Sequence, residues 1–528
     1  MLADVVLIGL PGAGKTTIGM AVAEALNTDF IDTDVLVETL AGKQIREIFA
    51  EEGESRFREL ELDAATDALA GQAVVSLGGG AVMNPAIRQM ITGRKVIWLD
   101  VCVTTLTRRI GMNKLRPLLL DDLRSQLTKL AAERISVYQQ AASCRVDAEG
   151  PIDVVVAAVL ACLDRVVITV SSDHPYDVII GHSIASGAAH YLDGVTRTAV
   201  LYPKVLATQV AEVSQDWPNP VMIEVPDSEL AKTHTVLANC WSRLAEAGLT
   251  RSDAVVGFGG GTTTDLAGFV AATYLRGIRY VNITTTVLGM ADAGLGGKTG
   301  INLDQGKNLV GAFWEPQVVL CDLDYLQGLE PTQVRSGLGE IIKCGFIADT
   351  AILDLVSSSP ESVCDPTSQQ FVEILSRAIK VKADVVSSDF RELGLGSHIG
   401  REALNYGHTL GHAIEKLEDF KIPHGFADSI GMVFAAEVAS RLAMISQSDL
   451  DHHCQILTAV GLPITYCGAD WTTLRAVMNL DKKTRGSQLR LVLLDGIGRP
   501  KIVANPDESL LAQAYLAIAD TQASNHIR

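Results

Sequence analysis

The stretch GLPGAGKTT at residues 9–17 constrains the fold more than any other part of the sequence. It fits the pattern G-x-x-x-x-G-K-[S/T], follows the apolar run VVLIGL and precedes a helical pattern. Its glycines let backbone N–H groups point at phosphate oxygens, Lys15 would reach the β- and γ-phosphates, and Thr16 would coordinate Mg²⁺. The sequence therefore predicts a nucleotide-binding turn between a buried strand and a helix.

The rest of the chain divides into three parts by pattern. Apolar, β-branched runs alternate with amphipathic stretches over residues 1–165, which predicts a three-layer α/β domain with a parallel sheet. Strands with glycine-rich turns follow over 166–328, and a mainly helical pattern fills 329–528. We therefore expect an α/β protein with a P-loop domain, a second α/β part and a helical part.

Composition excludes some partners. Lys and Arg total 44 against 62 Asp and Glu, for a net charge of −18. The sequence has no run of basic residues that would favour nucleic acid as a partner. The start of the chain lacks a signal-like pattern, and the apolar run at 154–163 is too short to span a bilayer. The nine cysteines include no C-x-x-C pair. We expect reduced thiols, a cytoplasmic location and no membrane partner.

Polar residues near the P-loop predict what receives the phosphate. Asp32 and Asp34 follow a short strand, and Gly78–Gly80 would let backbone approach a ligand closely. Arg58 and Arg134 lie on helical patterns, and Arg116 precedes one. Several arginines beside one P-loop favour an acceptor that carries a carboxylate, because guanidinium groups bind carboxylates in a bidentate fashion.

The order P-loop, D-T-D, F-R-x-x-E, G-G-G, R-P-L-L and R-x-x-x-Y resembles shikimate kinase over residues 1–165. The resemblance implies ATP with Mg²⁺ as cofactor and shikimate as substrate. For the nucleotide it implies Gly12, Gly14, Lys15, Thr16, Thr17 and Arg109, with Asp32 near Mg²⁺. For shikimate it implies Asp34, Arg58, Gly79, Gly80 and Arg134. It also implies that Lys15, Asp34 and Arg116 are catalytic, with Arg116 over the transferring phosphate.

A second group of residues suggests a metal site. His408 and His412 are four apart on one helical face, His424 follows soon after, and Glu340 and Lys343 share a face of another helix. A carboxylate and two or three histidines make a plausible Zn²⁺ site, although the zincin glutamate is absent. Gly259–Gly261 form a turn suited to a pyrophosphate but do not match G-x-G-x-x-G.

Runs such as GGGTTTDLAGFVAATYLRG, GGKTGINL, GKNLVGAFWEP and NYGHTLGHAIE resemble 3-dehydroquinate synthase over 166–528. The resemblance implies that 166–328 binds NAD⁺, that 329–528 binds Zn²⁺ or Co²⁺ and substrate, and that the enzyme is a homodimer. It implies Zn²⁺ on Glu340, His408 and His424. It implies NAD⁺ on Glu229, Lys232, Gly260, Gly261, Asp265, Thr285, Thr286, Asp292, Lys307 and Asn308. It implies substrate, 3-deoxy-D-arabino-heptulosonate 7-phosphate, on Asp292, Lys298, Asn308, Lys343, Lys382, Arg401, Asn405, His412 and Lys482. Its implied catalytic residues are Arg276, Lys298, Lys343, Lys382 and His412.

Two other enzymes stay open for the C-terminal part, a related sugar-phosphate cyclase and an NAD- and metal-dependent polyol dehydrogenase. A metabolite-sensing scaffold with one inactive domain is the non-enzyme alternative, and the intact sets of polar residues argue against it. Thr264, Thr284 and Phe426 depart from the residues usual in the family. We expect these departures to alter affinity rather than to abolish activity.

Overall fold

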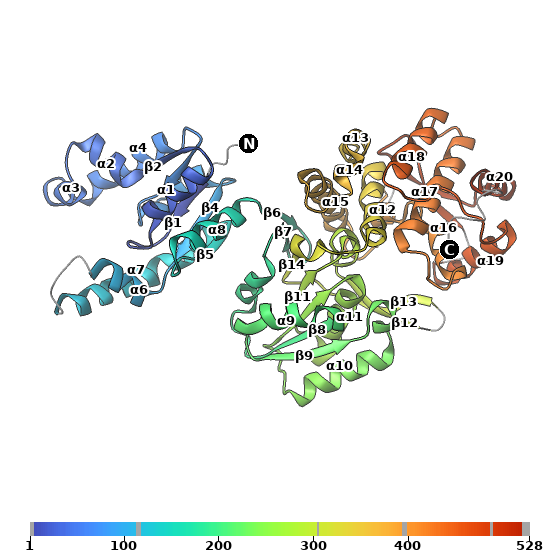
Figure 1. Ribbon diagram of the computed structural model, residues 1–528, viewed down its shortest axis with the longest axis horizontal. Coiled ribbons are helices and arrows are strands. Elements are labelled where there is room, and N and C mark those ends of the chain that lie inside the picture. The colour runs from blue at the N-terminus through green and yellow to red at the C-terminus, as the bar shows by residue number, and fades with distance from the viewer. Residues whose placement is uncertain (1–4, 112–117, 304–305, 393–398, 486–488, 520–528) are drawn as a thin grey trace. The chain divides into compact units, whose positions relative to one another are not determined.

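The computed structural model describes residues 5–111, 118–303, 306–392, 399–485 and 489–519. It divides the chain into two compact units, residues 1–165 and 166–528, called unit 1 and unit 2 below (Figure 1). Within the described residues, no helix combines the length and the apolar character that crossing a membrane requires.

Unit 1 is built on a five-stranded parallel sheet in the order β2-β3-β1-β4-β5. Its strands are β1 Val5–Ile8, β2 Asp29–Asp32, β3 Ala73–Ser76, β4 Lys95–Asp100 and β5 Cys144–Asp147. The central strands β1 and β3 are buried along their whole length, as their apolar sequences predict. The strand that leads into the P-loop is therefore the middle strand of the sheet.

Helices cover this sheet and supply its apolar core. They are α1 Lys15–Ala25, α2 Thr33–Ala41, α3 Ile45–Glu51, α4 Gly53–Ala68, α5 Pro85–Ile91, α6 Val103–Gly111, α7 Leu118–Ala141 and α8 Ile152–Leu163. The core joins the strands to apolar residues of α1, α4, α5, α6, α7 and α8. Because β1, β2 and β3 run parallel, their carboxyl ends meet at one edge, where loops carry polar residues.

Unit 2 begins with a seven-stranded sheet in the order β6-β7-β14-β11-β10-β8-β9. All neighbouring pairs are parallel except β6 with β7. The strands are β6 Val166–Val170, β7 Tyr176–Gly181, β8 Thr198–Pro203, β9 Pro220–Val225, β10 Ala254–Gly259, β11 Arg279–Thr284 and β14 Val318–Asp322. The helices of this part are α9 Ala207–Val213, α10 His234–Glu246 and α11 Gly261–Thr273, and β12 Lys298–Leu303 pairs with β13 Gly306–Phe313 as a separate antiparallel hairpin.

The second half of unit 2 is mainly helical. Its elements are α12 Pro331–Ile347, α13 Ala351–Ser358, α14 Pro360–Val363, α15 Gln369–Ser388, α16 His408–Leu417, α17 His424–Arg441, α18 Gln447–Ala459, α19 Trp471–Arg485, β15 Arg490–Leu494, β16 Pro500–Ala504 and α20 Glu508–Ile518. Helices α12 and α17 are buried over most of their lengths. One apolar core runs from β6, β7 and β14 into these helices, so the sheet and the helical half form a single unit.

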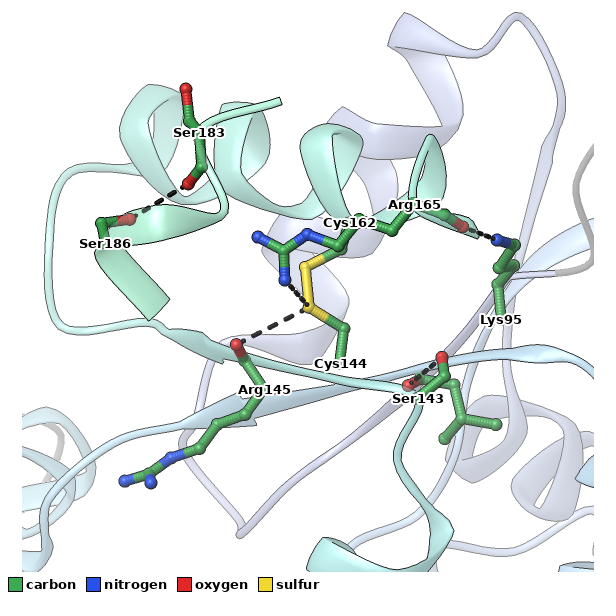
Figure 2. The surroundings of a disulfide bond; sticks show 9 residues. Lys95, Ser143, Cys144, Arg145, Cys162, Arg165, Ser183 and Ser186 are labelled. Carbon is green, nitrogen blue, oxygen red and sulfur yellow. Dashed lines mark hydrogen bonds between the residues drawn. A yellow bond between two sulfur atoms is a disulfide. The ribbon is translucent and has the colours of Figure 1, made fainter. Parts of the chain in front are cut away.

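One expectation about cysteines is wrong. We expected nine reduced thiols, but the structure joins Cys144 to Cys162 by a disulfide bond (Figure 2). The bond links β5 to α8, whose packing brings the two Cα atoms to 6.2 Å, within the range that a disulfide needs. The guanidinium of Arg165 lies 3.1 Å from Cys144 Sγ. The last strand and the last helix of unit 1 are therefore held together covalently.

Removing this bond should weaken unit 1. The disulfide closes a loop with a sequence separation of 18 residues, and a loop of that size stabilises by about 3 kcal/mol. We expect Cys162→Ser to lower the free energy of unfolding of unit 1 by about that amount, measured by urea-dependent hydrogen exchange of peptides from residues 1–165. Dithiothreitol should reproduce the loss in the parent chain and leave the variant unchanged. Cys102→Ser, at an exposed free thiol, is the control; equal stability of all three proteins would contradict the prediction.

A buried carboxylate fixes the start of β10. Asp253 accepts backbone N–H bonds from Thr196, Arg197 and Thr250 and hydroxyl bonds from both threonines. Burial by itself raises the pKa of Asp253, but these hydrogen bonds outweigh it and lower the pKa to about 2. The charged form is thus preferred in the folded chain, and β8 and β10 begin in register.

This shift predicts a pH dependence. Because the folded pKa of Asp253 lies below the ordinary value for aspartate, its stabilisation is present above about pH 4 and is lost as the pH falls towards 2. Asp253→Asn should lower stability at pH 7 and flatten the loss of unfolding free energy between about pH 4 and pH 2, measured by urea unfolding at each pH. A pH profile parallel to that of the parent chain would show that Asp253 is not the titrating group.

Candidate functional sites

The first site begins with the P-loop between β1 and α1. Gly12 has a φ of 82° and Gly14 a φ of 94°, left-handed values that glycine adopts without strain. The loop turns its backbone inward, and Lys15 donates to the carbonyls of Gly9 (3.0 Å) and Leu10 (3.4 Å). Burial lowers the pKa of Lys15, while Asp34 and Asp32 oppose the shift. An ammonium held over a nest of N–H groups is the arrangement that binds phosphate.

Two carboxylates from the end of β2 face this loop. Thr16 donates its hydroxyl to Asp32 Oδ2 at 2.7 Å, and Asp32 Oδ1 accepts the backbone N–H of Asp34 at 3.0 Å. Hydroxyl and carboxylate oxygens are the ligands that Mg²⁺ prefers in proteins. Asp32 also caps α2, which directs Asp34 towards the loop after β3, where a Cβ on Gly78 would lie 2.6 Å from Asp34 Oδ1.

Arginines converge on the same loop. Arg134 donates to the carbonyl of Gly79 at 2.7 Å. A Cβ on Gly80 would lie 2.9 Å from an Arg58 nitrogen and 3.6 Å from an Arg134 nitrogen, so only a glycine leaves this space open. The structure thus brings together Asp34, Arg58, Gly79, Gly80 and Arg134, the set that the resemblance to shikimate kinase implies.

Three more residues of unit 1 were expected to contact the nucleotide or the transferring phosphate. Arg109 donates to the carbonyls of Ala13 (3.4 Å) and Ala148 (2.8 Å) and therefore lies beside the P-loop. Thr17 is exposed on the first turn of α1. Arg116 lies outside the described residues.

The second site contains a turn of the same kind, between β10 and α11. Gly260 is the N-terminal cap of α11, and its Cα faces Thr286 in the segment after β11. Thr285 is buried, and its N–H donates to Gly259 O at 3.0 Å. Asp265 on α11 lies 2.5 Å from the ammonium of Lys232, which is 2% exposed and also donates to Asn308. Burial raises the pKa of Asp265, and Lys232 opposes the shift.

Carboxylates around Lys307 connect this turn to the helical half. Lys307 lies 3.3 Å from Glu229 and 3.2 Å from Glu415 on α16. Glu229 also accepts from Asn302 at 2.6 Å, and Asn302 accepts the N–H of Asn308 at 2.9 Å. The hairpin β12–β13 is therefore tied at one end to residues of both halves of unit 2.

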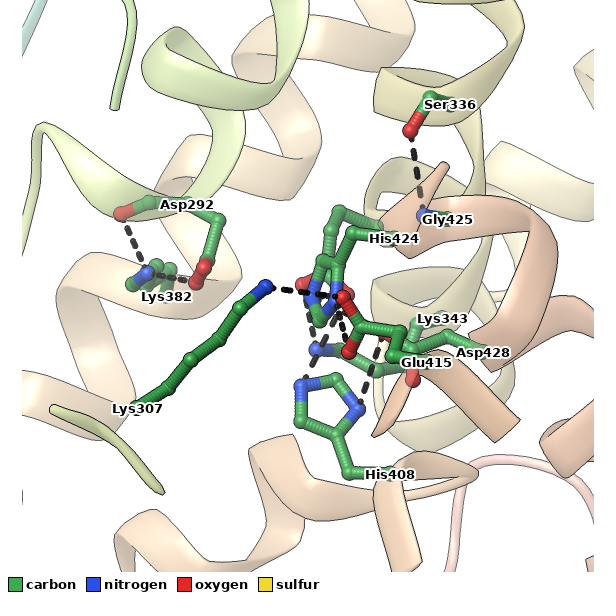
Figure 3. A network of polar contacts seen from close by, with 11 residues as sticks. Asp292, Lys307, Ser336, Lys343, Lys382, His408, Glu415, His424, Gly425 and Asp428 are labelled. Carbon is green, nitrogen blue, oxygen red and sulfur yellow. Dashed lines mark hydrogen bonds and ion pairs between the residues drawn. The ribbon is translucent and has the colours of Figure 1, made fainter. Parts of the chain in front are cut away.

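A buried lysine pairs with a partly exposed aspartate between α15 and the π-helical turn Gly289–Ala293 (Figure 3). Lys382 donates to the carboxylate and, at 2.5 Å, to the carbonyl of Asp292. Burial alone would raise the pKa of Asp292, but Lys382 and then Lys343 lower it below its usual range. Arg401 is 3% exposed and donates to Phe390 O at 2.8 Å, and burial lowers its pKa.

The histidines gather where α12, α16 and α17 pack together (Figure 3). Glu340 Oε2 pairs with Lys343, three residues on along α12, which leaves Oε1 facing His408 Nε2 at 3.9 Å and His424 Nε2 at 3.8 Å. The imidazole rings of His408 and His424 are 5.2 Å apart. Burial, and then Lys343, lower the pKa of His408 well below its usual value, so its ring is neutral, the form that binds metals.

Asp428 belongs to this cluster and was not predicted from the sequence. It is fully buried on α17, one turn after His424, and four ligand atoms of Glu340, His408, His424 and Asp428 lie within 4.8 Å of one another. Glu415, also unpredicted, lies 3.1 Å from His424 Nδ1. A carboxylate four residues after a candidate ligand on one helix was the available signal.

The other predicted residues differ in how close they lie to these contacts, and His412 belongs to the histidine cluster because its ligand atom lies within 4.8 Å of those of His408 and His424. Lys298, at the start of β12, pairs with Glu392 at 2.6 Å, and Asn405 is half-buried just before α16. Arg276 is exposed in the turn after α11, and within the described part of the chain no hydrogen bond or ion pair links it to the clusters above. His412 is exposed on α16 with its ring 4.9 Å from that of His408. Lys482 lies on α19, and its side chain is outside the described residues.

The three unusual residues fit the fold. Thr264 is buried and donates to Gly261 O at 2.9 Å in the first turn of α11, and Thr284 is buried and donates to Leu320 O at 3.3 Å. Phe426 packs against the core of the helical half. The two threonine hydroxyls are therefore hydrogen-bonded, and the phenylalanine ring is packed against apolar residues.

Comparison with known proteins follows the same division. The shikimate kinase family model matches residues 11–164, and the models of the N- and C-terminal parts of 3-dehydroquinate synthase match 222–336 and 337–484. The 3-dehydroquinate synthase of Cutibacterium acnes is 51% identical over 358 residues, which is 66% of this chain and 98% of that protein. The 3-dehydroquinate synthase of Thermobifida fusca is 50% identical over 351 residues, 65% of this chain and 94% of that protein.

A solved structure is also similar. A crystal structure of 2-deoxy-scyllo-inosose synthase complexed with carbaglucose-6-phosphate, NAD⁺ and Co²⁺ has a TM-score of 0.60 and 26% identity. The match covers 66% of this chain and 99% of that one.

The Lys232–Asp265 pair gives a prediction that is independent of catalysis. Lys232→Met should lower the free energy of unfolding of unit 2 by about 3–5 kcal/mol, because it leaves Asp265 buried without its cation. Lys232→Met combined with Asp265→Leu should recover most of that loss, measured by urea unfolding of the full chain. A double variant as unstable as the single one would show that the pair stabilises through packing and not through charge.

Proposed function

This chain belongs to the 3-dehydroquinate synthase family and carries a shikimate kinase region ahead of it, and from this premise we propose how its residues act. It is a bifunctional enzyme of the shikimate pathway. Unit 1 phosphorylates shikimate with ATP, and unit 2 converts 3-deoxy-D-arabino-heptulosonate 7-phosphate to 3-dehydroquinate and phosphate. The observation that supports the residue roles is the convergence of ligand atoms from Glu340, His408 and His424 beside buried lysines.

In unit 1 catalysis is positioning and charge neutralisation. Lys15 and the N–H groups of the P-loop hold the ATP phosphates, and Thr16 with Asp32 would hold Mg²⁺, which neutralises phosphate charge when bound. Arg58 and Arg134 bind the carboxylate of shikimate over the open backbone at Gly79 and Gly80. Asp34 accepts a hydrogen bond from the attacking hydroxyl, and Arg116 would cover the transferring phosphate.

A divalent metal fits unit 2. Glu340 Oε1 and His408 Nδ1 are buried and have no hydrogen-bond partner among the described residues. Two imidazoles and a carboxylate suit Zn²⁺ or Co²⁺, and the structurally similar cyclase was solved with Co²⁺ and NAD⁺. Such a metal supplies a Lewis acid for a substrate hydroxyl. Glu415 orients His424 by accepting from Nδ1, which directs Nε2 towards the metal position.

NAD⁺ fits the β10–α11 turn and supplies a reversible hydride acceptor when bound. Gly260 and Gly261 would present their backbone to a pyrophosphate, and Thr285 and Thr286 belong to the neighbouring segment after β11. Lys232 orients Asp265, and Glu229 and Lys307 border the same site.

Basic residues hold the substrate's phosphate and carboxylate. Lys343 and Lys382 present buried ammonium groups, each already oriented by a carboxylate, and Asp292 lies between them and the NAD⁺ turn. Lys298, Asn308, Arg401, Asn405 and Lys482 complete the substrate set, and His412 is the exposed group that can exchange a proton with the substrate. The resemblance implies that Arg276 is catalytic, although no hydrogen bond or ion pair among the described residues links it to these clusters.

We place the enzyme in the cytoplasm, where its relatives' biosynthetic role fits, and expect a homodimer formed through unit 2. The hairpin β12–β13 supports this, because Leu309 and Val310 are 44% and 38% exposed on it. Light scattering of the full chain tests the dimer, and a monomer at micromolar concentration would exclude it.

The polyol dehydrogenase and cyclase alternatives are weaker. The relatives at about half identity are 3-dehydroquinate synthases, whereas the cyclase is 26% identical. With substrate, NAD⁺ and Zn²⁺, phosphate should be released without lasting absorbance at 340 nm. Accumulating NADH would identify a dehydrogenase instead.

The two activities should separate by mutation. Lys15→Met should reduce shikimate-dependent ADP formation by about 100-fold or more, because phosphate positioning is lost, and leave phosphate release from the heptulosonate unchanged. His412→Asn should reduce phosphate release from the heptulosonate by about 100-fold and leave shikimate-dependent ADP formation unchanged. Both assays use the full chain. Loss of both activities in either variant would contradict independent sites.

A further inference from the structure

Asp428 is the most unusual charged group in unit 2. Its side chain is fully buried on α17, and neither carboxylate oxygen accepts a hydrogen bond of ordinary geometry from the described residues. Oδ2 lies 3.0 Å from His424 Nε2 and 3.4 Å from His408 Nδ1. A buried carboxylate without hydrogen bonds is costly unless a cation lies beside it.

The lysines nearby are already engaged. Lys343 pairs with Glu340 and Lys382 pairs with Asp292. Two ligand atoms near Asp428 have no lysine partner: Glu340 Oε1, which has no hydrogen-bond partner in the described chain, and His424 Nε2, whose ring presents it because Nδ1 faces Glu415. The view in Figure 3 shows Asp428 beside the two histidines and Lys343.

The fold makes room for the Asp428 carboxylate because residue 411 is a glycine. A Cβ on Gly411 would lie 2.2 Å from Asp428 Oδ1. Gly411 lies between His408 and His412 on α16, so any larger residue there would displace Asp428 from the histidines. The backbone of α16 therefore approaches α17 closely enough for both helices to contribute to one centre.

We propose that Asp428 is a fourth protein ligand of the metal in unit 2, so that the centre has two imidazoles and two carboxylates. This rests on the metal proposed above for Glu340, His408 and His424. Two carboxylates balance the charge of a divalent ion, which retains it in a buried site.

The competing role is indirect. Asp428 could instead accept a hydrogen bond from His408 Nδ1–H and only orient that ring, as Glu415 does for His424. The two roles differ in whether Asp428 lies in the coordination sphere of the metal. A ligand changes the coordination sphere when it is removed, whereas an orienting carboxylate changes affinity alone.

The test uses the full chain loaded with Co²⁺, with Asp428→Asn and the matched control Glu415→Gln. Affinity is measured by competition with a chromophoric chelator, coordination by the visible absorption of Co²⁺, and folding by circular dichroism. We expect Asp428→Asn to weaken Co²⁺ binding by more than about 100-fold and to alter the absorption bands. Glu415→Gln should cost about 10–100-fold and leave the bands unchanged. Unchanged bands in Asp428→Asn would overturn the proposal.

A crystal structure of the metal-loaded parent chain decides the matter even if Asp428→Asn fails to fold. An Asp428 oxygen within about 2.0–2.2 Å of the metal supports the proposal, and one beyond about 3 Å overturns it while leaving the three-residue site intact. A parent chain that binds no metal at Glu340, His408 and His424 would overturn both this inference and the metal centre proposed above.

Discussion

The pairing of buried lysines with carboxylates is the constraint on which unit 2 depends. Lys232 with Asp265, Lys343 with Glu340 and Lys382 with Asp292 each place an ammonium group of low exposure against an acidic side chain. Such pairs add little net stability compared with apolar residues, but they become expensive if one partner is lost. The Lys382–Asp292 pair ties α15 to the π-helical turn, and the Lys232–Asp265 pair ties the segment before α10 to α11, whereas the Lys343–Glu340 pair lies within α12. An acidic chain can in this way present positive charge to an anionic substrate without a basic surface.

Both sites are built on the same backbone arrangement, a strand followed by a glycine-rich turn and a helix. In unit 1 the central strand β1 ends in a glycine-rich turn and the helix α1, and in unit 2 the strand β10 ends in a glycine-rich turn and the helix α11. In each unit parallel strands bring the following loops to one edge, so residues distant in sequence meet there. The rigid sheet holds the backbone amides, and the polar residues come from the segments around them.

Much of this could be predicted from the sequence, for identifiable reasons. The P-loop has fixed spacing between a strand and a helix, and the parallel strands are continuous apolar runs, so both were predictable. The antiparallel pairing of β6 with β7 was not, because a buried strand looks the same in either direction. Asp428 was missed because its proximity to His408 depends on the close approach of α16 to α17 at Gly411, which the sequence of α17 does not show. The Cys144–Cys162 bond was missed because the two residues become neighbours only when α8 packs on β5.

That bond has a mechanical consequence. Cys162 lies three residues before the end of unit 1, and Cys144 lies on the edge strand of its sheet. A pulling force that enters from the unit 2 side, as when a protein-unfolding motor draws in the chain from its C-terminus, meets the disulfide before it reaches β5. While the bond is intact, α8 cannot be peeled away from β5 beyond this crosslink. The load then passes to the sheet as a whole, so the oxidised unit 1 should resist sequential unravelling that the reduced unit would undergo strand by strand.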